Sequence, residues 1–529
     1  MSISFRPPSD EAFLRAQPLS GPGRPDAGKW ILAATILASS MAFIDGTVVN
    51  VALPALQSDL HASVTQVQWV VEAYALFLSA FLLLGGSLGD HYGRRRLFLL
   101  GVGLFTLGSA GCGVAPGIVA LILARAGQGV GAALLVPGSL AIISASFSEA
   151  KRGRAIGTWS GFTAITAAIG PLLGGWLIEQ FSWRAIFFLN LPLALVVIWL
   201  SLRHLPESRD ERGQGQLDWL GAFLTVLSLG GIIFGLIESS RLGFAHPAVE
   251  SALGGGLLLA GCFIAWEAHA PAPMLPFSLF RSRNFSGANL LTLLLYAALG
   301  GTLFFLPLNL IQVQGYSATA AGAALLPFIL LMFLLSRWGG SLVERYGAKW
   351  PLVIGPFIAG LGFALFVRPG IGGTYWATFF PAVVVLGIGM ATSVAPLTTT
   401  VMNAAAANRV GLASGINNMV ARAASLLAIA ILGIVMVHTF DRSLTRQIDR
   451  TQLSASEAQI LNTQRSNLAA VHFPPAMDPA TRQRMKQAVD TAFVQGFRVV
   501  MLIGAGLALG SATIAFLVIR ENARPTPPG

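Results

Sequence analysis

Long apolar segments alternate with short polar segments along most of this 529-residue chain. A helix needs about 20 predominantly apolar residues to cross the hydrocarbon core of a bilayer. Because lipid offers the backbone no hydrogen bonds, such segments must be helical. We therefore predict an all-α polytopic membrane protein with 14 transmembrane helices. The predicted spans lie near residues 30–53, 68–89, 97–115, 119–145, 154–178, 185–203, 217–237, 250–268, 287–311, 319–338, 350–369, 374–398, 411–437 and 496–519.

The composition indicates the same class of protein. Only 11% of the residues are charged and 54% are hydrophobic, whereas soluble domains carry about 25% charged residues. So few charges cannot cover a water-facing surface. The formal net charge of +11 does not indicate a nucleic-acid partner, since no basic run is interleaved with aromatic residues.

The basic residues fall in alternate loops, and this pattern sets the orientation. The loops after the second and fourth predicted spans hold basic clusters at 94–96 and 151–154, whereas the loops in between hold at most one basic residue. Membrane proteins collect Lys and Arg in short cytoplasmic loops. We therefore expect a multi-pass inner-membrane protein with both termini cytoplasmic. The long segment 439–495 is predicted outside despite its arginines, because long loops escape this rule.

Neither a cofactor nor a metal ion is expected. Cys112 and Cys262 both lie inside apolar runs, and two cysteines are too few for a metal site. No phosphate-binding loop occurs, which argues against ATP-driven pumping. Residues 1–28 hold five prolines among polar residues and are expected to form a disordered cytoplasmic tail.

The chain also repeats itself. Residues 86–95 read GSLGDHYGRR, and residues 340–349 read GSLVERYGAK. A second match, at nearly the same offset, pairs glycines 129, 131 and 157 with glycines 387, 389 and 415. An even number of predicted crossings separates the copies, so the two halves should run parallel, as in transporters built from parallel repeats.

This repeat defines the predicted domain organisation. It requires two six-helix bundles, with one additional pair of helices inserted between them. The predicted units are a tail over 1–28, a first bundle over 29–205, inserted helices over 206–270, a second bundle over 281–438 and 496–520, and an extracytoplasmic loop over 439–495.

Several segments resemble motifs of the major facilitator superfamily. Residues 86–97, GSLGDHYGRRRL, resemble its signature loop, and residues 121–132, LILARAGQGVGA, resemble its fourth-helix motif with one buried arginine. Residues 170–175, GPLLGG, resemble its fifth-helix exporter motif. Residues 45–54, DGTVVNVALP, and 183–192, WRAIFFLNLP, are similar to the fourteen-helix drug:proton antiporter branch. The resemblance implies export of drugs or similar amphiphiles in exchange for protons.

The resemblance also implies roles for two sets of residues. The cytoplasmic gate motif comprises Gly86, Asp90, Gly93, Arg94 and Arg95, and the antiporter motif comprises Gly170, Pro171, Gly174 and Gly175. Asp90 is expected to latch the gate, by pairing with basic residues or by capping a helix of the other half. The glycines and proline of the antiporter motif have two open interpretations, which are close packing of small residues and a bend that favours one gate state.

Charged residues inside the predicted spans are candidates for proton coupling. Each costs about 2.5–3.5 kcal/mol in a bilayer, so Asp45, Glu72 and Arg125 are expected to be paired or used. Helix rise places all three in the outer half of the membrane, where they could form one cluster. Glu72 lies nearest the surface, and we expect it to be the better hydrated of the two carboxylates. The alternative is a static ion pair that only fixes helix register.

Substrate contacts are less defined by sequence. Aromatic and amide side chains on the spans suit an amphipathic ligand, although each is more often a packing residue. The candidate cavity residues are Phe43, Tyr74, Trp159, Phe162, Tyr296, Asn309, Asn417 and Arg422. Arg422 lies one residue later than the resemblance leads us to expect, a rotation of about 100° on a helix.

Two other functions remain open at this stage. A lipid or lipid-precursor flippase would use the same scaffold, and a membrane enzyme or sensor would use segment 439–495. That segment has no cysteine and no Ser/His/Asp spacing that indicates catalysis. The expected partners are protons, a small amphipathic substrate and the lipid bilayer, and a periplasmic adaptor with an outer-membrane channel is not excluded.

Overall fold

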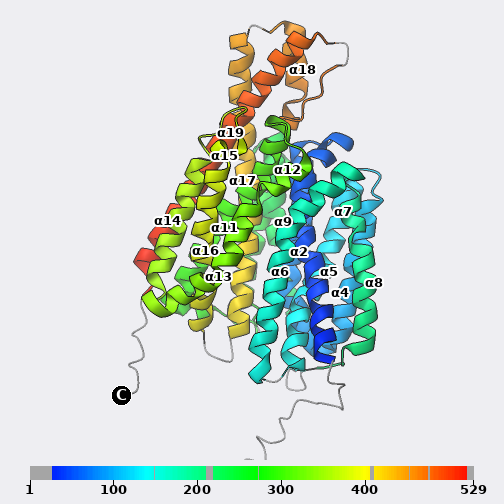
Figure 1. Ribbon diagram of the computed structural model, residues 1–529, viewed down its shortest axis with the longest axis vertical. Coiled ribbons are helices and arrows are strands. Elements are labelled where there is room, and N and C mark those ends of the chain that lie inside the picture. Colours follow the sequence, from blue (N-terminus) through cyan, green and yellow to red (C-terminus); the bar gives the residue numbers. More distant parts are fainter. Residues whose placement is uncertain are drawn as a thin grey trace, which may run out of the picture.

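The computed structural model describes residues 27–147, 149–209, 218–271, 273–405, 410–451, 453–474 and 477–520, and every regular element in these ranges is a helix. Most of the helices run roughly parallel to the long axis of the molecule (Figure 1). The helices of the first part are α2 (Ala27–Asp59), α3 (Val64–Tyr92), α4 (Arg94–Gly113), α5 (Ile118–Ser146), α6 (Glu149–Gln180), α7 (Ala185–Phe188) and α8 (Asn190–His204). The middle pair is α9 (Trp219–Leu242) and α10 (Pro247–His269), followed by the 3-10 turn η1 (Phe277–Arg281).

The last part of the chain is also helical. It comprises α11 (Arg283–Leu308), the π-helical turn η2 (Asn309–Val313), α12 (Ala318–Ala323), α13 (Leu326–Tyr346), α14 (Lys349–Leu365), α15 (Tyr375–Thr378), α16 (Phe380–Asn403), α17 (Val410–Thr451), α18 (Ala455–Thr463), η4 (Arg465–Asn467) and α19 (Pro479–Val518). We call residues 27–205 the first half and residues 283–520 the second half. The end of the molecule that carries α18 is called the α18 end.

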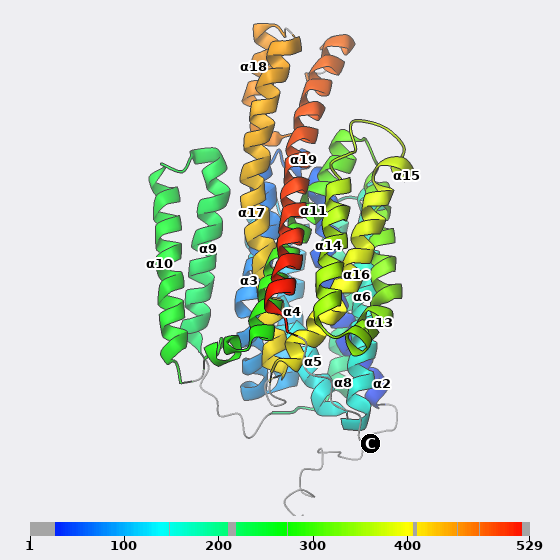
Figure 2. The same cartoon turned by 90° about the vertical axis from the view of Figure 1, so that its left-hand side faces the viewer.

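Each of the predicted apolar runs falls mainly on helical residues, and four of them, 185–203, 287–311, 319–338 and 374–398, are divided between two helical elements. Within the described residues, 11 helices are long and apolar enough to cross a membrane. The chain is therefore an all-helical multi-pass membrane protein, while the count of 14 crossings stays a prediction. Segment 439–495 differs from the predicted loop, because α17 and α19 continue as helices well beyond the bundle (Figure 2). Hydropathy marks only the apolar part of such a helix, and its polar continuation is satisfied by water.

The helices α9 and α10 lie to one side of the bundle (Figure 2). Helix α9 packs against α3 and α17, and α10 packs against α9. An apolar cluster of Leu76, Ile233, Ile237, Leu426 and Ala430 joins α3, α9 and α17. The inserted pair therefore covers a seam where a helix of the first half meets a helix of the second.

The same glycine contacts occur in both halves. The Cα of Gly131 packs against the backbone of Phe105, and that of Gly389 packs against the backbone of Ala359. Likewise, Gly101 approaches Leu134 and Leu135 of α5, and Gly355 approaches Ser393 of α16. A Cβ at any of these glycines would meet backbone atoms of the neighbouring helix, so small residues allow the helices to approach closely. Helix α5 is thereby fixed against α4 as α16 is fixed against α14.

The two halves meet at the α18 end. Hydrogen bonds that join them include Gln57 to Asn467 (3.0 Å), Gln312 to Gln57 (2.9 Å), Gln68 to the carbonyl of Ile429 (3.1 Å), and the N–H of Thr319 to Glu179 (2.7 Å). Each of them lies near the α18 end of its first-half helix. The described contacts therefore close this end of the molecule.

Candidate functional site

Asp45 and Arg125 form an ion pair inside the first half. Asp45 lies on α2 and Arg125 on α5, and each is 1% exposed. The guanidinium Nη1 donates to Asp45 Oδ2 and also to Gln128 Oε1 (2.7 Å), while Gln128 Nε2 donates to Asp45 Oδ1 (2.8 Å). Both oxygens of the carboxylate are thus engaged. The prediction that these two charges lie together agrees with this geometry.

Aromatic rings and a backbone carbonyl complete the surroundings of Arg125. Its Nε donates to the carbonyl oxygen of Val70 on α3 (3.1 Å). Its guanidinium carbon lies 4.2 Å from the ring centroid of Tyr74 and 5.8 Å from that of Phe187. Such cation–π contacts are worth about 2 kcal/mol or more when desolvated. The Arg125 charge is therefore held by three helices at once and can be released only if its partners change.

Gln128 is a member of this network that the sequence analysis did not single out. It is 0% exposed and joins Arg125 to Asp45. The signal that could have found it is its spacing, because residues three apart lie on the same face of a helix. A polar residue three positions after a buried arginine is a candidate partner for that arginine.

Glu72 is not part of this cluster, and the predictions of a three-charge cluster and of a hydrated Glu72 are both wrong. Residues two apart on a helix point about 200° from each other, so Glu72 faces away from Tyr74 and Arg125. Its side chain is 0% exposed, and neither carboxylate oxygen has a hydrogen-bond partner among the described residues. The depth of Glu72 along its helix, which the sequence gives, did not reveal that neighbouring helices cover its side chain.

The helices covering Glu72 follow from its neighbours on α3. Gln68, one turn before it, donates to the carbonyl of Ile429 on α17. Leu76, one turn after it, belongs to the apolar cluster shared with α9 and α17. Residues four apart share a face, so Glu72 lies at the seam between the halves, beneath the inserted pair.

Arg422 of α17 is a second-half charge close enough to the site to act on Tyr74. It is partly buried, and it makes no hydrogen bond or ion pair with a described residue. Its charge acts on the Tyr74 side chain, as do those of Asp45 and Arg125. Tyr74 in turn donates from its hydroxyl to the carbonyl of Ala42 (3.2 Å). Tyr74 therefore lies between the charges of the two halves.

The other predicted cavity residues are mostly engaged in packing. Trp159 donates to Ser39 (3.0 Å) and packs with Phe43, and Asn417 donates to Asn289 (3.1 Å) and Thr292 (2.7 Å) within the second half. Asn309 is buried in η2, near the α18 end, where it accepts from Gln314. Phe162 is 52% exposed on α6, and Tyr296 is partly buried on α11. A substrate role for any of them stays a prediction.

The antiporter motif on α6 contacts both α2 and the second half. Gly170 packs against Thr47, and Gly174 packs against Val48, both on α2. Gly175 packs against the backbone of Ala318 and Thr319. A Cβ at each position would overlap its neighbour. The close-packing interpretation is therefore supported at these glycines.

The second half also contributes a glycine to its contact with α6. Gly322 of α12 packs against the carbonyl of Pro171. Close approach of α6 and α12 thus depends on small residues on both sides of the contact between the halves.

The gate motif forms the turn between α3 and α4. Gly93 ends α3 with a φ of 111°, and Gly347 ends α13 with a φ of 76°, a backbone region that favours glycine. The Arg95 backbone N–H donates to Glu207 (3.1 Å), and its Nη2 donates to the carbonyl of Leu202 (3.0 Å). Gly86 lies within α3, and the N–H of Arg94 donates to Ser208 (3.0 Å). The Asp90 side chain lies outside the described residues, so its latch role stays a prediction.

A metal site is not formed by the part of the chain that the structure describes, where no three His, Cys, Asp or Glu side chains lie together. What the site presents is a buried ion pair and a separate buried carboxyl group in a bundle of spanning helices.

Comparison with known proteins identifies the family. The model of the Major Facilitator Superfamily matches residues 35–429, and the chain belongs to this family of membrane transporters. The chain is 35% identical over 420 residues to the multidrug resistance protein Stp of Mycobacterium tuberculosis, covering 79% of this chain and 78% of that protein. It is 30% identical over 497 residues to the tetracenomycin C resistance and export protein of Streptomyces glaucescens, covering 92% of this chain and 90% of that protein.

Solved structures show the same fold at low identity. A bacterial homologue of the human lysosomal transporter Spinster, in an inward-facing and occupied conformation, matches with a TM-score of 0.65 at 17% identity. The match covers 94% of this chain and 97% of that chain. The all-helical fold of this family is therefore confirmed, while the drug:proton antiporter branch is a finer assignment.

Proposed function

We propose that this protein is a proton-driven exporter of small amphipathic compounds, of the fourteen-helix drug:proton antiporter branch. The observation that carries the proposal is the sealed network of Asp45, Arg125 and Gln128 in the first half. An intramembrane ion pair is expensive to bury and is retained where it is used. The relatives named for multidrug resistance and for antibiotic export support the substrate class.

The coupling step takes place at Asp45. A proton that binds one carboxylate oxygen neutralises the group and removes its attraction for Arg125. Arg125 stays charged at all physiological pH values and must then find another partner. Loss of the proton restores the pair. Exchange of the two arrangements couples proton entry to substrate exit if each is stable in only one access state.

The access states differ in which end of the molecule is closed. Basic residues gather at the end opposite α18, so we assign that end to the cytoplasm. The hydrogen bonds between the halves would then hold the extracytoplasmic end closed. The recurring glycine contacts support two parallel six-helix repeats that rock against each other, with α9 and α10 as the inserted pair.

The gate motif works at the cytoplasmic end. Asp90 latches this end when it closes, by pairing with basic residues or by capping a helix of the other half. Asp90→Asn should therefore slow transport while substrate binding changes little. Loss of binding in a folded variant would contradict this role.

The proposal is tested in liposomes that contain the purified protein and an imposed pH difference. A cationic dye such as ethidium should move against its gradient, and an uncoupler should stop the movement. A fluorescent phospholipid, followed across the bilayer in the same liposomes, tests the flippase alternative. Dye transport against its gradient that persists without a pH difference would contradict proton coupling, and movement of the phospholipid alone would favour the flippase.

A further inference from the structure

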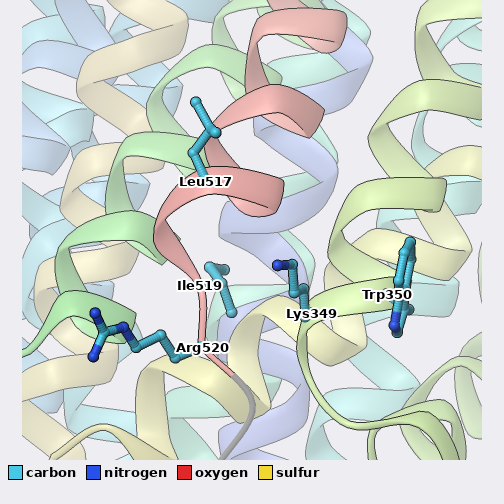
Figure 3. A pocket seen from close by; sticks show the side chains of 5 residues that line it. All are labelled: Lys349, Trp350, Leu517, Ile519 and Arg520. Atoms are coloured by element: carbon cyan, nitrogen blue, oxygen red, sulfur yellow. The ribbon is translucent and has the colours of Figure 1, made fainter.

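A basic recess lies at the base of the second half, away from the Asp45 network. It has a volume of about 540 Å³ and is lined by Lys349 and Trp350 of α14 and by Leu517, Ile519 and Arg520 at the end of α19. Figure 3 shows the Lys349 and Arg520 side chains on either side of Ile519. We propose that this recess binds the phosphate of an anionic phospholipid.

The recess carries positive charge that no described acidic side chain neutralises. Neither Lys349 nor Arg520 forms an ion pair with a described residue; Lys349 Nζ lies 4.6 Å from the ring centroid of Phe516, and the Arg520 backbone alone pairs with Asn284. Helix α14 begins at Lys349 with no side-chain hydrogen bond at its N-cap. The unpaired N–H groups of a helix start add to the attraction for an anion.

The recess opens onto a lipid-facing surface. Trp350, Ile354, Phe357 and Leu361 follow one stripe of α14, and each is 47–49% exposed. Leu517, at the end of the adjacent α19, is 71% exposed. An apolar stripe this exposed on a helix of a membrane protein is expected to face lipid. A phosphate in the recess would therefore place its acyl chains along α14 and α19.

The level in the membrane also fits a lipid headgroup. Trp350 and the two cations lie where the apolar parts of α14 and α19 end. Tryptophan and basic side chains gather at this interface in membrane proteins, and basic pockets between helices bind anionic headgroups. Lys349 is the last residue of the second copy of the gate-loop repeat. A lipid bound here would therefore contact a turn that should move when the halves rock against each other.

The test is native mass spectrometry of the delipidated full-length protein, titrated with phosphatidylglycerol or with phosphatidylcholine of the same acyl chains. Lys349→Gln with Arg520→Gln should weaken phosphatidylglycerol binding on the order of thirtyfold, since each basic residue contributes about fivefold. Phosphatidylcholine binding should change little. The charge-preserving pair Lys349→Arg with Arg520→Lys should retain most of the affinity.

Arg203→Gln is the matched control, because Arg203 also lies beside an exposed tryptophan, Trp199, at the end of a first-half helix. It should leave the tight phosphatidylglycerol site intact. Equal losses in the control and the double variant would overturn the proposal.

The remaining arms distinguish other occupants of the recess. Glycerol 3-phosphate or inorganic phosphate that displaces the lipid at equal concentration would identify a site for soluble anions and overturn the lipid assignment. Deletion of residues 521–529 should leave the affinity unchanged. A tenfold or greater gain after the deletion would mean that the chain's own C-terminal segment occupies the recess, and this too would overturn the proposal.

Discussion

Asp45 and Glu72 are both carboxylic acids buried in the first half, but their surroundings are opposite. Asp45 has an arginine and a glutamine on its two oxygens, whereas Glu72 has no hydrogen-bond partner among the described residues. A buried charge without a partner costs far more free energy than a paired one, so a negative charge is much better stabilised at Asp45 than at Glu72. Similar positions in a hydropathy profile thus conceal opposite electrostatic surroundings.

The two residues also depend on different contacts. The hydrogen-bond and ring contacts of the Asp45–Arg125 pair all come from helices of the first half, so the pair should survive a movement of one half against the other. Glu72 is sealed by α17 of the second half and by α9. Opening the α18 end should therefore hydrate Glu72 and leave the surroundings of Asp45 closed. The following predictions test this difference, from the largest expected effect to the smallest.

The largest effect is expected from Asp45→Asn. Asparagine keeps the size and most hydrogen bonds of Asp45 but cannot titrate, so proton-driven dye transport in liposomes should fall to the level of empty liposomes. Passive exchange of dye should persist. Asp59→Asn is the matched control, since Asp59 lies on the same helix but is half exposed and pairs with Arg184 at the surface. Uphill transport by purified Asp45→Asn would remove Asp45 from the coupling role.

Arg125→Gln should make Asp45 resemble Glu72. Removing one partner of a buried ion pair costs about 3–5 kcal/mol, so the variant should unfold at a clearly lower temperature. The carboxyl group of Asp45 should then become neutral and react with a hydrophobic carbodiimide, a reaction detected by peptide mass spectrometry. Adding Asp45→Asn should recover much of the lost stability. An unchanged melting temperature in the single variant would contradict the ion-pair assignment.

Glu72→Gln should reduce proton-driven transport less than Asp45→Asn does. The amide mimics the neutral acid, so only steps that need the charged form are slowed. In the wild-type protein, the carbodiimide should label Glu72 and spare Asp45. Labelling of Asp45 in preference to Glu72 would contradict the difference inferred here between the surroundings of the two carboxyl groups.

Gly175→Ala should have the smallest effect of the four. Its Cβ would overlap the backbone of Ala318 and Thr319, and overpacking of this kind costs about 1–3 kcal/mol. The closed α18 end should open more often, which would hydrate Glu72 and lower its carbodiimide labelling. Gly161→Ala on the same helix is the control, because no atom lies within 4 Å of its added Cβ. Equal labelling in the two variants would mean that Glu72 is not sealed by closure of the halves.

The sequence predicted the helices well because lipid imposes one strong rule on each span. It also placed Asp45 and Arg125 in one candidate cluster, since motif position and depth put both residues at a similar level on first-half helices. Glu72 was misjudged because burial between α3, α9 and α17 depends on helix rotation and on contacts across more than 350 residues. Gln128 was missed for the same reason, because its role depends on its side-chain amide pointing toward both Arg125 and Asp45. Depth along a helix can be read from a sequence, but the neighbours around it cannot.

The extension of α17 and α19 beyond the bundle has a mechanical consequence. Helix α17 runs without interruption for 42 residues, about 63 Å at the rise of an α-helix. If the second half tilts as proposed, α17 would carry α18 far from the tilt axis and would act as a rigid lever. Even a small rotation at the Arg422 level would displace α18 by a larger distance than any atom within the bundle. The distance between one fluorophore on α18 and another at the end of α2 should therefore change measurably during each turnover of a single molecule.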